Sequence, residues 1–235
     1  MKNRKKDKNR LKYFKYNVTP AIAKEMRNWH KRLIVDKVIT ALEENNYNVL
    51  YAETKERALE AVKKIIPEDV TVGLGGSMTV VECGILDMLQ NGKYILYNQY
   101  RDDLTPAEAA KLRRKGLTAQ FYVTGTNAVT MDGKLVNIDG MGNRVAAITY
   151  GPEKVIIVVG INKIVTDVQE GIDRARNCAA VLNSKRLNIH NPCVKTGKCE
   201  DCKLSTRICN HLVITERQPK KGRVTVIIVG EELGF

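Results

Sequence analysis

Helical and strand-like runs of apolar residues alternate along most of the chain. From Pro20 to about Asn45, apolar residues recur near helical spacing, which predicts an N-terminal helix with one apolar face. Short apolar runs follow, and the clearest, Lys154–Val159, is apolar on both faces like a central strand of a parallel sheet. This alternation predicts an α/β protein with a doubly wound, mostly parallel sheet. The expected strands are Tyr47–Ala52, Asp69–Leu74, Lys93–Tyr97, Gln120–Thr124, Lys154–Val159 and Arg223–Val229.

Turn and capping residues mark the boundaries between these elements. The stretch Thr105–Glu108, TPAE, combines an N-cap, a first-turn proline and a capping-box glutamate, which predicts a helix start. Thr79 and Glu82 have the same capping-box spacing, so a second helix is expected to begin there. The pair Asp132-Gly133 lies between apolar residues and predicts a β-hairpin.

Three glycine-rich loops follow predicted strands and form the candidate binding site. The first, at 75–79, leads into a helix start, where free N–H groups favour an anion. It lacks the Gly-Lys-Ser/Thr of a Walker loop, and Met78 stands at the third glycine position of a dinucleotide fingerprint. Loops 124–127 and 139–144 should meet it, because ligands of open α/β sheets collect at the carboxyl ends of strands. The candidate ligand-binding residues are Gly75, Gly76, Ser77, Thr79, Gly125, Thr126, Asn127, Asp139, Asn143 and Arg144. The alternative is structural: a tight turn without a ligand, Asx-turns and helix caps.

The charge of the chain is concentrated at its N-terminus. The net charge is +13, and residues 1–15 carry eight Lys or Arg against one Asp. We expect a basic tail over residues 1–18 and a single α/β domain over residues 19–235. A solvated leader is favoured over an arm that binds an anionic partner, and no aromatic-basic signature favours nucleic acid. No apolar run is long enough to span a membrane and no secretory h-region is present, so a cytoplasmic protein is expected.

Four of the six cysteines gather in the segment 190–212 with the spacing C-x5-C-x2-C-x6-C. They are Cys193, Cys199, Cys202 and Cys209. Thiols stay reduced in the cytoplasm, so this cluster predicts a metal centre more than disulfides or idle thiols. Four thiolates suit zinc or an iron–sulfur cluster, and the spacing does not decide between them. The segment is expected as a small insertion before the last strand.

Several stretches resemble the LUD domain of lactate-utilization proteins. They are VGLGGSMT at 72–79, VTGTNAVTMDGKLVNIDGMGNRVAAITYGPEKVIIVVGINKIV at 123–165 and VIIVGEELGF at 226–235. The cysteine motif, PC at 192–193, GKC at 197–199, DC at 201–202 and RICN at 207–210, resembles an uncharacterised bacterial and archaeal branch of that family. The resemblance implies a fold similar to ribose-5-phosphate isomerase A, CoA transferases and 5-formyltetrahydrofolate cyclo-ligase. However, Asp132-Gly133 is followed by Lys-Leu and not by the acids of the isomerase motif, so isomerase chemistry is not expected.

The leading hypothesis is therefore a protein of lactate or related 2-hydroxy or 2-oxo acid metabolism. It would bind a small anionic metabolite at the three loops and a metal at the four cysteines. The resemblance implies iron–sulfur oxidoreductase subunits as partners, and a homo-oligomer is compatible with it. A non-catalytic assembly or regulatory subunit with a structural zinc is the alternative, and a sugar-phosphate or acyl-transfer enzyme is the weaker one. Whether the protein is an enzyme is left open.

Overall fold

The structure is a computed structural model, and it describes residues 19–235. The described chain divides into two compact units, residues 19–36 and residues 37–235, and each is described by itself. The expected basic tail over 1–18 lies outside the described residues, so its boundary stays a prediction. Helix α1 (Pro20–Glu44) has the predicted bounds and ends in the second unit, where Val38 and Leu42 are fully buried.

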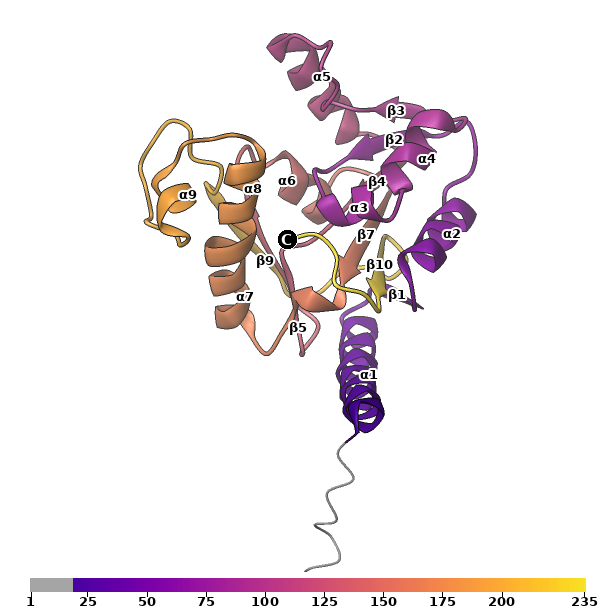
Figure 1. The fold of residues 1–235 in the computed structure, drawn as a ribbon. Coiled ribbons are helices and arrows are strands. Elements are labelled where there is room, and N and C mark those ends of the chain that lie inside the picture. The colour runs from indigo at the N-terminus through magenta and orange to yellow at the C-terminus, as the bar shows by residue number, and fades with distance from the viewer. Residues whose placement is uncertain (1–18) are drawn as a thin grey trace, which may run out of the picture. The chain divides into compact units, whose positions relative to one another are not determined.

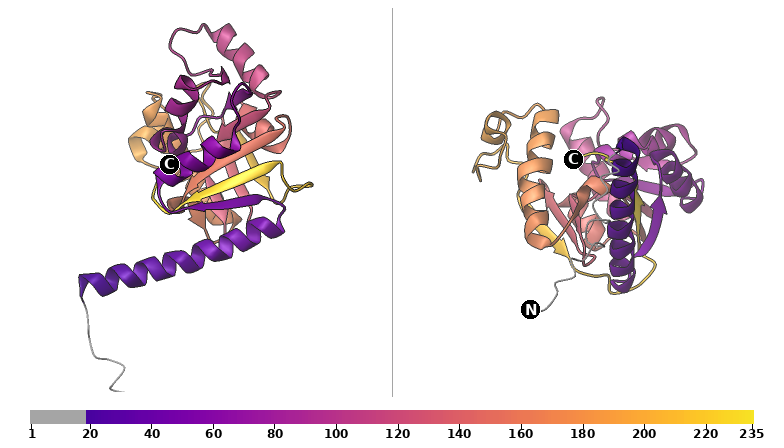
Figure 2. Two further views of the ribbon diagram at one scale, coloured as in Figure 1. Left: turned by 90° about the vertical axis from the view of Figure 1, so that its right-hand side faces the viewer. Right: turned by 60° about the horizontal axis from the view of Figure 1, so that its bottom comes forward.

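The second unit is built on a parallel sheet in the order β1-β10-β7-β4-β2-β3 (Figure 1). Its strands are β1 (Asn48–Ala52), β10 (Val224–Val229), β7 (Lys154–Gly160), β4 (Phe121–Thr124), β2 (Thr71–Leu74) and β3 (Ile95–Tyr97). Every neighbouring pair in this sheet is parallel. In Figure 2 the yellow strand β10 lies between β1 and β7, which places the last strand of the chain beside the first. The predicted α/β class with a mostly parallel sheet is confirmed.

Helices cover both faces of this sheet. They are α2 (Lys55–Ile65), α3 (Met78–Glu82), α4 (Ile85–Asn91), α5 (Pro106–Gly116) and α6 (Asn143–Thr149). The first three pack on one face, where Val62 and Leu89 join Val123 in a continuous core. Side chains alternate along a strand, so Tyr122 points to the opposite face, where a Cβ on Gly116 of α5 would lie 3.5 Å from its ring. The α5 start is a complete capping box, as its sequence predicted.

A second sheet, in the order β8-β5-β6-β9, was not predicted. Its strands are β8 (Ile164–Val165), β5 (Ala128–Thr130), β6 (Leu135–Asp139) and β9 (His211–Thr215). The hairpin of β5 and β6 forms at the predicted turn, where Gly133 has a φ of 79°. Strand β9 follows the cysteine segment and pairs with β6, so that segment does not lead directly into the last strand as expected.

A broken helix packs on this second sheet. It comprises α7 (Val168–Arg174), the π-helical turn Ala175–Ala179 and α8 (Ala180–Arg186), at the left in Figure 1. The 3₁₀ turn Ile161–Lys163 precedes β8, and the short helix α9 (Pro192–Thr196) follows α8. Among the described residues, none of the helices has the length and apolar character needed to cross a membrane.

Candidate functional site

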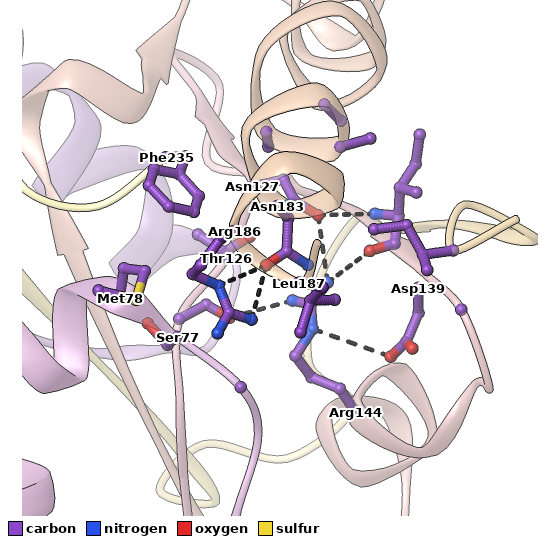
Figure 3. A pocket seen from close by; sticks show the side chains of 18 of the residues that line it. Ser77, Met78, Thr126, Asn127, Asp139, Arg144, Asn183, Arg186, Leu187 and Phe235 are labelled. Carbon is purple, nitrogen blue, oxygen red and sulfur yellow. Dashed lines mark hydrogen bonds and ion pairs between the residues drawn. The ribbon is translucent and has the colours of Figure 1, made fainter. Parts of the chain in front are cut away.

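A cavity of about 320 Å³ lies where β2, β4 and β6 end (Figure 3). The loops after these strands line one side of it, and α8 with the π-helical turn lines another. Eight of the candidate residues line the cavity: Gly76, Ser77, Gly125, Thr126, Asn127, Asp139, Asn143 and Arg144. The three loops therefore meet as the sequence indicated, and the binding of a ligand there stays a prediction.

Gly75 and Thr79 do not line this cavity. A Cβ on Gly75 would lie 2.8 Å from the Thr124 Cβ, so glycine is needed there for the β2 and β4 loops to pack closely. The Thr79 side chain is fully buried, and its hydroxyl donates to the Leu233 carbonyl at 3.2 Å. It also accepts a hydrogen bond from the Lys163 ammonium at 2.9 Å. Thr79 thus joins α3 to other parts of the chain.

The predicted capping box at Thr79 and Glu82 is wrong. The N-cap of α3 is Ser77, whose hydroxyl accepts from the Val80 N–H at 3.3 Å. The Glu82 carboxylate instead accepts from the Gly234 N–H at 2.9 Å. Since α3 has only five residues, its dipole adds little to anion binding. Because the Ser77 hydroxyl acts as an acceptor in this cap, its proton stays available to donate a hydrogen bond.

Arg144 holds the loops of the cavity together. Its guanidinium donates to the Gly125 carbonyl at 3.2 Å and the Ile138 carbonyl at 2.6 Å. It also donates to the amide oxygens of Asn127 at 3.1 Å and Asn137 at 2.5 Å. The side chain is 11% exposed, and its Nε lies 3.8 Å from the Asp139 carboxylate. Most donors of Arg144 are therefore used within the chain, and its main role is to fix the loops.

Asn137 belongs to the same network and was not predicted. Its amide oxygen accepts from the Thr126 hydroxyl at 3.1 Å and from the Asn127 N–H at 3.3 Å, besides Arg144. Its amide nitrogen is buried without a hydrogen-bond partner among the described residues. The one sequence signal was a polar residue inside the apolar strand LVNID.

The cavity is rich in positive charge. Arg113, Lys163 and Arg186 line it together with Arg144. Within the described residues, Asp139 is the sole carboxylate side chain of the lining, and it is paired with Arg144. Arg186 donates twice to the Asn183 amide oxygen, at 2.9 and 2.8 Å. Nearby charges act strongly in a partly enclosed cavity, so this lining attracts anions.

Lys163 is the least expected member of the lining. Its side chain lies in the 3₁₀ turn before β8 and is 3% exposed. Burial lowers its pKa to about 7, with smaller contributions from the cations Arg174 and Arg144. The sequence signal was a lysine within the apolar run VVGINKIV at 158–165.

The four cysteines of the C-terminal segment are half-buried free thiols. Arg207 orders the segment, since its guanidinium donates to the carbonyls of Cys202 at 2.7 Å and Cys209 at 3.2 Å. In residues 19–235, no three His, Cys, Asp or Glu side chains are placed together as a set that could hold a metal ion. The side chains as they lie therefore do not fit a four-ligand site, and the metal stays a prediction from the spacing.

The end of the cysteine segment contacts the cavity. The Asn210 N–H donates to the Asp139 carbonyl at 2.9 Å, and its side-chain amide donates to the Gly140 carbonyl at 3.0 Å. Ile208 lines the cavity itself. The two candidate sites of the sequence are thus neighbours in the fold.

Comparisons with known proteins identify one matching family. The family model described as LUD domain matches residues 35–229. The comparison with curated proteins gave no match. A DUF162 family protein from Deinococcus radiodurans has a similar structure, with a TM-score of 0.49 and 17% identity over 85% of this chain and 98% of that one.

Two more distant structures are also similar. Ribose 5-phosphate isomerase A from Methanocaldococcus jannaschii gives a TM-score of 0.30 and 18% identity over 48% of this chain and 54% of that one. For eIF2B delta from Chaetomium thermophilum the TM-score is 0.33, with 20% identity over 70% of this chain and 63% of that one. At these TM-scores, none of the three structures bears on what the chain binds.

Proposed function

Because the chain belongs to the LUD domain family, we propose that it serves the metabolism of lactate or a related 2-hydroxy or 2-oxo acid. In this proposal the small carboxylate binds in the cavity between the loops after β2, β4 and β6. Family membership supports the link to lactate utilization, and the lining of the cavity supports the choice of an anion.

The observation that carries the proposal is the excess of cations in the lining. Arg113, Lys163 and Arg186 have no carboxylate partner within 4.0 Å among the described residues, whereas Asp139 is already paired. A carboxylate ligand would meet this unbalanced charge in a partly desolvated place, where charge-assisted hydrogen bonds are strong. The Ser77 hydroxyl is a further donor, suited to the hydroxyl or carbonyl oxygen beside the carboxylate.

The size of the cavity is compatible with a small metabolite. Its volume of about 320 Å³ is at the lower end of the range of small-molecule sites. A larger anion such as a sugar phosphate could also enter it, so the test has to separate the two classes.

Titration calorimetry with lactate, pyruvate, ribose 5-phosphate and uncharged lactamide tests this function. We expect the carboxylates to bind and lactamide not to bind. Arg113→Gln should raise the Kd about 10- to 100-fold, because a hydrogen bond to a charged group contributes about 1.5–3 kcal/mol. Arg114→Gln is the matched control on the same helix, since Arg114 is exposed and outside the lining. Binding of ribose 5-phosphate alone, or equal effects of the two variants, would refute the proposal.

A metal at the four cysteines is the second part of the proposed function. The spacing supports it, and the contact of Asn210 with the Asp139 loop places the segment beside the cavity. Metal and sulfide analysis of protein purified without oxygen is the test, with Cys202→Ser as the variant and Cys83→Ala as a control outside the segment. Iron with sulfide would support electron transfer, and zinc would support a structural role. Absence of both metals from the intact protein would overturn this part.

A further inference from the structure

Among the residues that the structure describes, Lys163 is a buried amine without a carboxylate counter-ion. Its side chain is 3% exposed, and in residues 19–235 no Asp or Glu carboxylate lies within 4.0 Å of its nitrogen. Lysines are almost never fully buried unless they are paired. Arg144, the other deeply placed cation of the lining, donates four hydrogen bonds and has an obvious structural role. No comparable network of hydrogen bonds accounts for the burial of Lys163 within the described residues.

Within the described part of the chain, the Lys163 amine makes one hydrogen bond, which leaves it available to the cavity. The nitrogen donates to the Thr79 hydroxyl at 2.9 Å, and that hydroxyl donates onward to the Leu233 carbonyl at 3.2 Å. An amine held by one N–H keeps its lone pair free. Lys163 also lines the same cavity as Ser77 and Arg186, so a ligand bound there would share the cavity with this amine.

The surroundings favour the neutral form of this amine. Four charged or titratable groups act on it: Arg174 from α7, Arg144 from α6, Glu82 from α3 and Cys178 from the π-helical turn. Arg174 is fixed by donating to the carbonyls of Asn127 at 2.6 Å and Asn162 at 3.1 Å. Burial and the two arginines outweigh Glu82 and Cys178. A lysine desolvated beside other cations is the usual arrangement of an amine nucleophile.

We propose that Lys163 is the reacting amine of the cavity and condenses with the carbonyl of a bound 2-oxo acid to form an imine. The inference rests on the proposed function and narrows its ligand to acids that carry a carbonyl beside the carboxylate. The lone pair of the amine attacks the carbonyl carbon and forms a C–N bond. The carbonyl oxygen takes up both protons of the amine and leaves as water, so that the C=O bond is replaced by the C=N bond of the imine. No oxidant or reductant is needed for this step.

Small residues form part of the lining of the cavity that Lys163 also lines. Ala175, Ala179 and Ala180 line the cavity from the π-helical turn and the start of α8. Single π turns within helices often occur at functional sites. The cations Arg113 and Arg186 remain to meet the carboxylate of the acid.

Reductive trapping of the full-length protein tests the imine. The protein is incubated with pyruvate and sodium cyanoborohydride at pH 7, and the adduct is located by peptide mass spectrometry. We expect one adduct, on Lys163. An amine with the ordinary lysine pKa has on the order of 1,000-fold less neutral form at this pH. The rate of trapping should rise with a midpoint near pH 7, following the pKa of about 7.

Variants separate the reacting amine from a structural lysine. Lys163→Arg has no primary amine and should lose the adduct, whereas Lys154→Arg, at an exposed lysine, should keep it. Thr79→Val removes the acceptor of the Lys163 hydrogen bond and the donor to the Leu233 carbonyl, but it leaves the amine in place and should also keep the adduct. Urea unfolding checks that each variant is folded.

Pyruvate binding by calorimetry distinguishes the two proposals. If pyruvate binds to the wild-type protein but no Lys163 adduct forms, the imine is wrong and the anion site stands. If adducts form on exposed lysines and persist in Lys163→Arg, the imine is also wrong. If pyruvate neither binds nor is trapped, both proposals fail together.

Discussion

Truncation of Arg144 should destabilise the second unit strongly, although this residue lies in a cavity. Arg144→Met removes four hydrogen bonds of 2.5 to 3.2 Å from a side chain that is 11% exposed. Each bond to a charged donor contributes about 1.5–3 kcal/mol. Three of the four acceptors keep a second donor, so the losses are not additive. The Ile138 carbonyl loses its side-chain donor, the sole one among the described residues, and Asp139 loses its ion pair. We expect a decrease of about 3–5 kcal/mol in the free energy of unfolding.

Urea unfolding followed by circular dichroism measures this difference. With a slope of about 2 kcal/mol per molar urea, the midpoint should fall by about 2 M. Arg113→Met is the control from the same cavity, because among the described residues the guanidinium of Arg113 makes one hydrogen bond, to the Met141 sulfur at 3.6 Å. It should change stability by less than about 0.5 kcal/mol. Arg144→Lys should lie between the two, since it keeps the charge and loses the planar set of donors. A loss below about 1 kcal/mol for Arg144→Met would refute the assignment of Arg144 as the residue that fixes the loops.

Three further predictions concern positions outside this network. Gly133→Ala should lower the free energy of unfolding, measured in urea, by at least about 2 kcal/mol more than Gly222→Ala does. Both glycines have a positive φ, so both variants are strained. Of the two, only a Cβ on Gly133 would also meet backbone, at 2.6 Å from the Ala41 carbonyl carbon. Equal losses of unfolding free energy in the two variants would show that α1 shifts to make room for the added Cβ. Thr105→Ala should cost about 1 kcal/mol, since it removes the N-cap of α5, and an unchanged urea midpoint would contradict the capping box. The pKa of Lys163 is lowered to about 7 in the folded state. Between pH 7 and pH 10.5 this lysine is therefore protonated in the unfolded chain but mostly neutral in the folded protein. The free energy of unfolding consequently falls as the pH is lowered. Relative to Lys163→Met, the unfolding free energy should therefore rise by about 1.4 kcal/mol per pH unit in this window, and parallel pH profiles would contradict the lowered pKa.

The sequence predicted the layers of the fold better than their arrangement. Apolar periodicity and capping residues located α1, the start of α5 and most strands of the parallel sheet, because these signals are local. The order of the strands is set by packing between segments far apart in sequence, so it could not be read from the pattern. Strand β9 (His211–Thr215) was missed because the cysteines before it favoured an irregular segment.

The candidate site shows the same division between local and long-range information. Glycine-rich loops after strands pointed to the right edge of the sheet, and Ser77 and Asn127 do line the cavity. The capping box at Thr79 failed because its hydroxyl is engaged by Leu233 and Lys163, residues distant in sequence. Lys163 itself could be recognised only after folding, since its chemistry depends on burial.

The hydrogen bonds of Arg144, Asn127 and Asn137 join loops that follow different strands, and they form when the chain folds. The conformational entropy lost in ordering these loops is therefore a cost of folding and not of association. A ligand entering a cavity shaped in this way needs no slow rearrangement of the backbone, so its association should be fast and of simple exponential form. Differences in affinity among related acids should then appear mainly in how long each one stays bound.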